Sequence, residues 1–153
     1  MLAGGVDAQV FFTRVGGFDT HANQQGEHAN LMRALGGSIS AFYDDLASVP
    51  TASGNAQDRV MILAWSEFGR RVQQNQNGTD HGTAGLHFAL GGSVAGGLYG
   101  EQPSLTRLSG DGNPAYALDF RSVYASLVEQ WFDVDAGRIL PDAARMRRMK
   151  LVA

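Results

Sequence analysis

The sequence predicts an α/β fold in which helices cover a mostly parallel sheet. Residues 9–15 and 59–65 are apolar runs with the length and composition of buried strands, and glycine or polar residues end each run. Residues 24–47 lie between the two runs and carry apolar residues at helical spacing. A strand, helix, strand order favours parallel pairing through a right-handed crossover. The two strands are therefore expected to end at the same edge of one sheet.

Three further elements follow along the chain. Residues 86–99 are apolar but interrupted by two glycine pairs, a pattern that predicts a third strand with a bend. Asp119 is expected to cap a second helix, because apolar residues recur at helical spacing from there to Trp131. The basic tail after Pro141 predicts a short, solvated terminal helix.

Composition and charge exclude several classes of partner. The chain has 153 residues, of which 44% are hydrophobic and 18% are charged, and its net charge is -3. Nucleic acids and anionic membranes favour a basic surface, so neither is expected as a partner. The absence of cysteine excludes thiolate metal sites and leaves carboxylates and imidazoles as ligands. No apolar run is long enough to span a bilayer, and no signal peptide is recognised in this chain.

The few predicted strands bear on domain organisation. A sheet covered by helices usually has more strands than the three or four visible here. We therefore expect residues 1–153 to form a single domain that is the carboxyl-terminal part of a larger fold. Its sheet edges would then be covered by an amino-terminal partner segment or by self-association into a homo-oligomer.

Polar residues with metal-binding chemistry follow both of the first two predicted strands. Asp19 and His21 come after the first strand, and Glu67, Asp80 and His81 come after the second. Side chains at the carboxyl ends of parallel strands meet at one edge of the sheet. Imidazoles and carboxylates together suit zinc, manganese, magnesium or calcium, depending on geometry. The sequence therefore predicts a divalent metal site, with zinc as the first expectation.

Such a site suggests ester hydrolysis. In a two-metal hydrolase, one ion activates a water or a nucleophile and the other stabilises the leaving oxygen of a phosphate or sulfate ester. Arg70 or Arg71 would bind the anionic ester bidentately, and Asn75 would add a neutral hydrogen bond. The expected partner is a small phosphorylated or sulfated molecule. Ser66 lacks the surrounding nucleophile-elbow motif, so no nucleophile is identified in the chain.

The same residues also have structural interpretations, which the residues alone leave open. Asp19 could cap the helix that follows it. Glu67 could begin a short helix and be stabilised by the helix dipole. Asp80 and His81 could belong to an ordinary turn.

Five motifs add a family resemblance. They are, in order, GGFDTH, SEFGRRV, GTDHG, GGSVAGGLYG and DFRSVYASLVEQW. Together they resemble the carboxyl-terminal half of the uncharacterised bacterial domain-of-unknown-function family 1501, over about residues 9–135. That family belongs to the alkaline-phosphatase-like superfamily, with sulfatases and cofactor-independent phosphoglycerate mutases as relatives. The resemblance implies the carboxyl-terminal portion of an alkaline-phosphatase-like α/β/α sandwich.

The resemblance also implies metal ligands. In the superfamily, these are an Asp and a His after one strand, an Asp-His pair after the next strand, and a further His in a following loop. Asp19 and His21 resemble the first pair, although their spacing is closer than in the superfamily. Glu67 stands at the second pair, but Phe68 occupies the position of its histidine. His81 resembles the loop histidine.

The resemblance leads to one function with one alternative. Asp80, beside His81, is expected to be a ligand or to orient one. The superfamily nucleophile comes from the amino-terminal half, and no residue here matches it. The chain is thus expected to be a metal-dependent phosphate- or sulfate-ester hydrolase-like domain that is incomplete for catalysis on its own. The alternative is a non-catalytic binding or assembly module that keeps the fold and one metal. Family members are commonly exported, which implies the periplasm or the cell exterior.

Overall fold

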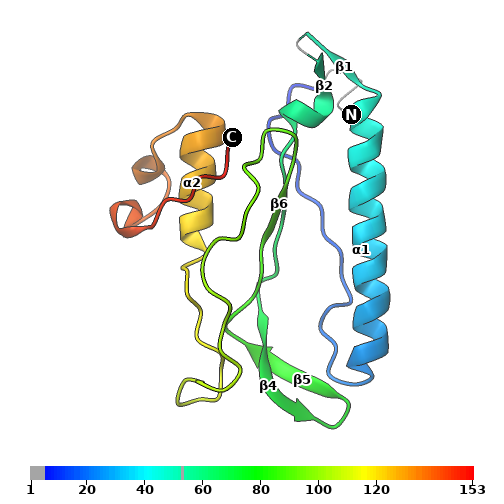
Figure 1. The fold of residues 1–153 in the computed structure, drawn as a ribbon, viewed down its shortest axis with the longest axis vertical. Coiled ribbons are helices and arrows are strands. Elements are labelled where there is room, and N and C mark those ends of the chain that lie inside the picture. The colour runs from blue at the N-terminus through cyan, green and yellow to red at the C-terminus, as the bar shows by residue number, and fades with distance from the viewer. Residues whose placement is uncertain (1–5, 53) are drawn as a thin grey trace.

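A computed structural model describes residues 6–52 and 54–153, so the lead before Val6 lies outside the described residues. Figure 1 shows a long helix on one side, short strands in the middle, and a second helical unit on the other side. In chain order, the helices and strands are α1 (Gln24–Ala47), β1 (Pro50–Thr51), β2 (Gly54–Asn55), β3 (Ile62–Ala64), β4 (Gly69–Asn75), β5 (Gly78–Gly82), β6 (Phe88–Leu90) and α2 (Arg121–Phe132). The part of the chain that the structure describes has no helix long and apolar enough to cross a membrane.

Helix α1 confirms the helix predicted over residues 24–47, and both of its ends lie where they were predicted. Leu31, Leu35 and Ile39 lie on one stripe and are half-buried, and Leu46 on the same stripe is fully buried. Gly36 lies on the exposed face, where a Cβ atom would meet nothing within 4 Å. The apolar stripe therefore fixes which side of the helix faces the rest of the chain.

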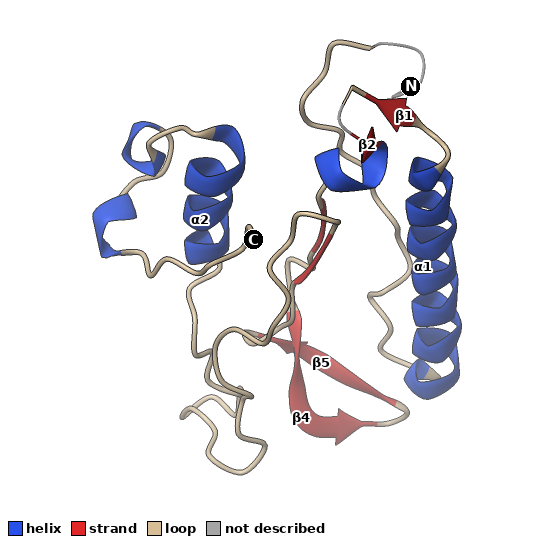
Figure 2. Cartoon of the chain, turned by 45° about the horizontal axis from the view of Figure 1, so that its top comes forward, coloured by secondary structure: helices blue, strands red, loops and turns tan. Residues whose placement is uncertain are grey.

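The strands pair only as antiparallel neighbours within the described residues, so the mostly parallel sheet is not observed. The pairs are β1 with β2, β3 with β6, and β4 with β5. A hairpin of β4 and β5 stands between β3 and β6 in the chain (Figure 2). The hairpin returns the chain beside β3 in the opposite direction, whereas a parallel pair would need a crossover connection. The predicted strand over residues 86–99 is confirmed only at Phe88–Leu90.

The predicted strand over residues 9–15 is wrong. In the described part of the chain, these residues pair with no strand and form a loop that runs alongside α1 (Figures 1 and 2). Val10 and Phe12 are 71% and 80% exposed. The segment has strand-like composition, but a strand forms only where a neighbour satisfies its backbone hydrogen bonds.

Helix α2 confirms the second predicted helix. The carboxylate of Asp119 accepts a 2.9 Å hydrogen bond from the backbone N–H of Arg121, but Phe120 occupies the N-cap position, so the cap predicted at Asp119 is displaced by one residue. The helix ends at Asp133, which adopts a left-handed conformation with φ of 54°. Its buried residue Ala125 packs with Ala136 and Ala143 in a small core.

The carboxyl-terminal tail does not form the predicted solvated helix. Only one 3₁₀ turn, Ala143–Arg145, follows Pro141. Met149 and Leu151 are instead buried, at 6% and 5% exposure. The buried hydroxyl of Ser126 on α2 accepts a 2.9 Å hydrogen bond from the backbone N–H of Met149. Burial of these two apolar side chains and this hydrogen bond hold the tail on α2.

We expect Ser126→Ala to lower the free energy of unfolding by about 1–3 kcal/mol, because it leaves the buried N–H of Met149 without an acceptor. Urea denaturation at fixed protein concentration measures this change. Ser38→Ala on the exposed face of α1 is the matched control and should change stability by less than about 0.5 kcal/mol. Equal effects of the two substitutions would contradict the role given to Ser126.

Candidate metal centre

The site is built from the β4–β5 hairpin and from the loop that precedes α1. Gln76 adopts a left-handed conformation, with φ of 46°, in the turn of the hairpin. Gly78 begins β5, and a Cβ atom there would lie 2.4 Å from the backbone oxygen of His21. Only glycine permits this approach of hairpin and loop. The hairpin therefore lies directly against the residues that carry Asp19 and His21.

Arg70 on β4 joins the loop to the hairpin. Its guanidinium donates 2.6 Å hydrogen bonds to the backbone oxygens of Phe18 and Thr79. A third, longer contact of 3.4 Å reaches the hydroxyl of Thr20. Because the guanidinium is planar and rigid, these contacts fix the loop and β5 at one spacing.

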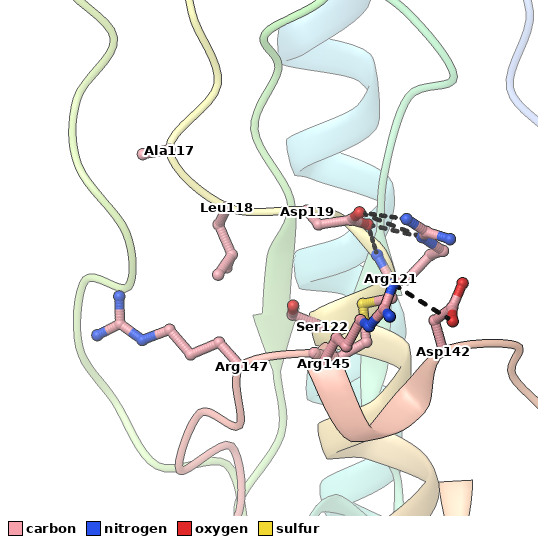
Figure 3. Close-up of a pocket in the computed structure, with 9 residues that line it drawn as sticks. Ala117, Leu118, Asp119, Arg121, Ser122, Asp142, Arg145 and Arg147 are labelled. Atoms are coloured by element: carbon pink, nitrogen blue, oxygen red, sulfur yellow. Dashed lines mark hydrogen bonds and ion pairs between the residues drawn. The ribbon is translucent and has the colours of Figure 1, made fainter. Parts of the chain in front are cut away.

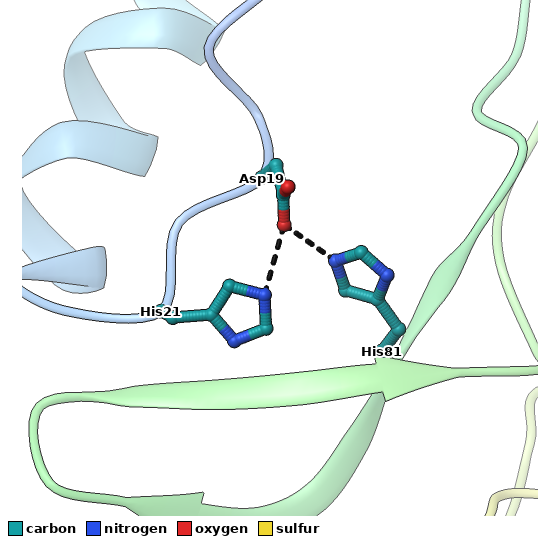
Figure 4. A group of neighbouring side chains, drawn as sticks. All are labelled: Asp19, His21 and His81. Carbon is teal, nitrogen blue, oxygen red and sulfur yellow. Dashed lines mark hydrogen bonds and ion pairs between the residues drawn. The ribbon is translucent and has the colours of Figure 1, made fainter.

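Three side chains converge at this junction (Figure 4). Nε2 of His81 lies 2.6 Å from Oδ1 of Asp19, and Nε2 of His21 lies 2.9 Å from the same oxygen. One potential ligand atom from each residue falls within 4.8 Å of the others. Two imidazole nitrogens and a carboxylate oxygen at one point form a three-protein-ligand set of the kind that catalytic zinc sites use.

The two histidines favour the charged form of Asp19 although the cluster lies at the surface. The side chains of Asp19, His21 and His81 are 65%, 48% and 43% exposed. The hydrogen bond from His81 holds the pKa of Asp19 below its ordinary value of 3.8, with the charges of the two histidines acting in the same direction and desolvation opposing them. Asp19 is therefore an anionic ligand at neutral pH.

The ring of His81 is held in an aromatic stack. It lies parallel to Phe68, with 4.0 Å between ring centroids and 9° between planes, and the ring of His21 lies 5.0 Å away on a tilted plane. The guanidinium carbon of Arg70 is 5.1 Å from the centre of the Phe68 ring. Phe68 therefore orients the ring of His81.

Asp80 and Asn75 stand beside the cluster. Oδ1 of Asp80 lies 3.6 Å from Nδ1 of His21, and the amide of Asn75 donates a 2.5 Å hydrogen bond to the same oxygen. A carboxylate behind a ligating histidine fixes the orientation and the tautomer of its ring. Of the two roles predicted for Asp80, this geometry favours orientation of His21.

The structure does not bring all predicted residues together. Glu67 is exposed in the turn before β4 and does not belong to the set of described ligand atoms within 4.8 Å. Arg71 lies exposed on β4. The guanidinium of Arg70, one of the residues predicted to bind the ester, already holds the backbone oxygens of the loop and of β5. These three residues therefore do not belong to the cluster.

Sequence reasoning missed the residues that support the cluster. Phe68 was considered only as a missing histidine, yet it stacks on His81. One feature of the sequence could have identified Gly78. It follows Asn77, and an Asn-Gly pair often marks a hairpin turn. Thr79 donates a 2.9 Å hydrogen bond to the side chain of Gln24 at the start of α1, a contact that no local pattern indicates.

A shallow cavity of about 350 Å³ lies beside the start of α2 (Figure 3). Arg121 forms a close ion pair with Asp119 there, and Arg145 lies 3.9 Å from Asp142. Two of the three arginines that line the cavity thus have acidic partners in its own wall, and the third is Arg147. None of the predicted site residues lines it.

The fold and the site define a small α/β chain that carries a surface cluster of one aspartate and two histidines. A family model described as "Protein of unknown function (DUF1501)" matches residues 3–138, and the chain belongs to this family. The family prediction from the five motifs is thereby confirmed. No curated protein and no solved structure matches the chain.

We expect Gly78→Ala to separate the loop from the hairpin, because the new Cβ would lie 2.4 Å from the backbone of His21. The free energy of unfolding should fall by about 1–3 kcal/mol. The ring signals of His21 and His81 should also shift in proton–nitrogen NMR spectra. Gly36→Ala on α1 has free space and should instead stabilise the chain by about 0.5–1 kcal/mol. Unchanged histidine signals in Gly78→Ala would contradict the close approach.

The carboxyl group of Asp19 should titrate below 3.8 in chelator-treated protein, as measured by carbon NMR. The folded chain favours the ionised form, so this stabilisation is present above the ordinary pKa and is lost as the pH falls through the lowered pKa. His81→Ala removes the main cause and should raise the Asp19 pKa towards 3.8. His28→Phe, which removes another imidazole but keeps the edge-on ring contact of this position with Phe18, should leave the pKa unchanged.

Proposed function

We propose that this chain is a metal-dependent, phosphate- or sulfate-ester hydrolase-like domain that is incomplete for catalysis on its own. The observation that carries the proposal is the convergence of Asp19, His21 and His81. The resemblance to the alkaline-phosphatase-like superfamily supports the class of substrate, an anionic ester. The same resemblance supports an exported protein and an alkaline-phosphatase-like sandwich completed by further polypeptide.

The donor set suits zinc, with manganese, magnesium or calcium as alternatives. A bound zinc ion would supply Lewis acidity towards an ester oxygen and would lower the pKa of a bound water. Asp19 contributes the negative charge of the set, and the two histidines contribute neutral nitrogens. Both histidines place Nε2 against Asp19, and Nδ1 of His21 lies 3.6 Å from Oδ1 of Asp80, beyond hydrogen-bond distance. A bound metal would take the lone pair of each Nε2 and leave the proton on Nδ1, where Asp80 is the neighbouring carboxylate of His21.

The residues around the cluster have separate supporting roles in the proposed site. Phe68 and Asp80 orient the two histidine rings. Arg71 follows Arg70 on β4 and projects to the opposite face of the strand, so we assign to it only a long-range electrostatic attraction of the anionic ester. Asn75 holds Asp80 through its amide. None of these side chains is placed as a nucleophile, which is why we assign that group to polypeptide outside this chain.

One observation favours the alternative, a non-catalytic module that binds a single metal. The three ligands are all exposed, and Glu67 does not join the set of described ligand atoms. An exposed site gains less from electrostatic interactions than a buried one, because water screens them. Binding of one metal for recognition or assembly needs only the three ligands that are present.

Metal content tests the cluster itself. Wild-type chain dialysed against zinc should retain one ion per chain in elemental mass spectrometry. His81→Ala should weaken zinc binding at least about tenfold, since removal of even a supporting group at a metal site costs that much. His28→Phe removes an exposed imidazole on α1 while it keeps the ring contact with Phe18, and it should bind zinc as the wild type does. Equal zinc in all three proteins, or none in the wild type, would refute the metal site.

Turnover then separates the two functions. The zinc-loaded chain is assayed with p-nitrophenyl phosphate and p-nitrophenyl sulfate, alone and with any polypeptide encoded upstream in the same reading frame. Hydrolysis that is lost in His81→Ala supports the hydrolase. Zinc binding without hydrolysis in either preparation supports the binding module.

A further inference from the structure

The shallow cavity beside the start of α2 has the size of a small-molecule site. Its volume of about 350 Å³ lies at the lower end of the range of about 300–1,000 Å³ that ligand pockets occupy. Two segments form its wall, residues 117–122 at the approach to α2 and residues 142–147 in the tail (Figure 3). None of Asp19, His21 and His81 lines it, so the cavity and the metal cluster share no residue.

One polar side chain in this wall is buried and, within the described residues, has no hydrogen-bond partner. Ser122 is only 2% exposed. Its backbone N–H donates to Asp119 and its carbonyl oxygen accepts from Ser126, whereas its own hydroxyl takes part in none of the hydrogen bonds among the described residues. Figure 3 shows the hydroxyl oxygen in the wall with Arg147 to one side and Arg145 to the other. A buried hydroxyl without a partner costs free energy, so a ligand that hydrogen-bonds to it gains affinity.

The wall of the cavity carries one net positive charge, because three arginines and two aspartates line it. Arg121 is neutralised by its close ion pair with Asp119. Arg145 is held only weakly, since it lies 3.9 Å from its aspartate and its side chain is 85% exposed, and exposed pairs of this kind contribute little. Arg147 forms none of the ion pairs found among the described residues. Two guanidinium groups therefore remain available to an anion.

We propose that this cavity binds a phosphate or sulfate group through the hydroxyl of Ser122 and the guanidinium groups of Arg145 and Arg147. Arginine binds the oxygens of such groups with two parallel N–H donors. The donors come from two segments and lie on different sides of the cavity (Figure 3), which suits a tetrahedral oxyanion better than a planar carboxylate. Arg147 is exposed and turns its side chain over the bound group without breaking an ion pair. Leu118 and Met146 add apolar wall, which would contact the organic part of an ester.

Proton–nitrogen NMR of the whole chain tests the site, with sodium phosphate titrated at constant ionic strength and neutral pH in the presence of EDTA. EDTA removes metal ions, so binding of phosphate to a metal at the Asp19, His21 and His81 cluster does not contribute. The backbone amides of Ser122, Arg145 and Arg147 should shift together and saturate. A second titration with phenyl phosphate distinguishes the source of the group. Tighter binding than inorganic phosphate assigns the cavity to an ester, and equal affinity assigns it to the free oxyanion.

Arg147→Gln should weaken phosphate binding at least about threefold, because hydrogen bonds from a charged donor are stronger than neutral ones. Arg107→Gln is the matched control, since it removes the same charge from an exposed arginine that does not line the cavity. It should bind phosphate as the wild type does. Equal weakening in both variants would assign the effect to net charge and overturn the proposal.

Ser122→Ala tests whether the hydroxyl serves the ligand or the fold. It should weaken phosphate binding and leave the urea midpoint unchanged, because the hydroxyl has no partner in the described part of the chain. Ser126→Ala, one turn later on α2, removes a hydroxyl that makes two hydrogen bonds and should show the reverse, with lower stability and unchanged phosphate affinity. Destabilisation by Ser122→Ala, or a wild type without saturating shifts at the cavity, would overturn the proposal.

Discussion

The contacts of Arg70 are the constraint on which the site depends. Its guanidinium connects backbone oxygens that are far apart in sequence, at Phe18 and Thr79, with 2.6 Å hydrogen bonds. Hydrogen bonds from a charged donor are stronger than neutral ones, and the fork of the guanidinium fixes their directions. Asp19 and His21 follow Phe18 directly, and His81 lies two residues after Thr79. The distances within the cluster are therefore set by a residue outside it.

This arrangement explains why Arg70 and Phe68 have roles at the site that their side-chain chemistry alone does not suggest. Arg70 would suit an anionic ester by its chemistry, yet it stabilises the loop. Phe68 has no polar group, yet it supports the cluster by stacking on His81. The stack also limits rotation of the imidazole, and a preorganised ring loses less entropy when it binds a partner.

The sequence predicted what local patterns determine, and failed where distant contacts decide. Both helices follow from apolar spacing, and the bounds of α1 were predicted in full. The β4–β5 hairpin was missed because its strands are polar and do not alternate with apolar residues. That omission also caused the error in strand direction. Asp19, His21 and His81 do lie together, but not at the ends of two parallel strands as predicted: His81 lies on β5, and the other two lie on the loop that packs against the hairpin. Phe68 and Gly78 could not be identified, because their roles depend on contacts across the two segments.

The exposed cluster and the exposed side chains of β6 have one common physical cause. Each sheet in the described residues has two strands, and a two-stranded sheet cannot bury both of its faces. On the β4–β5 sheet, His81 faces the loop that carries Asp19 and His21, and water solvates these polar side chains at little cost. On the β3–β6 sheet, Phe88 and Leu90 are exposed, and water solvates them poorly. The polar cluster can therefore stay exposed at little cost in free energy, whereas exposure of Phe88 and Leu90 is unfavourable.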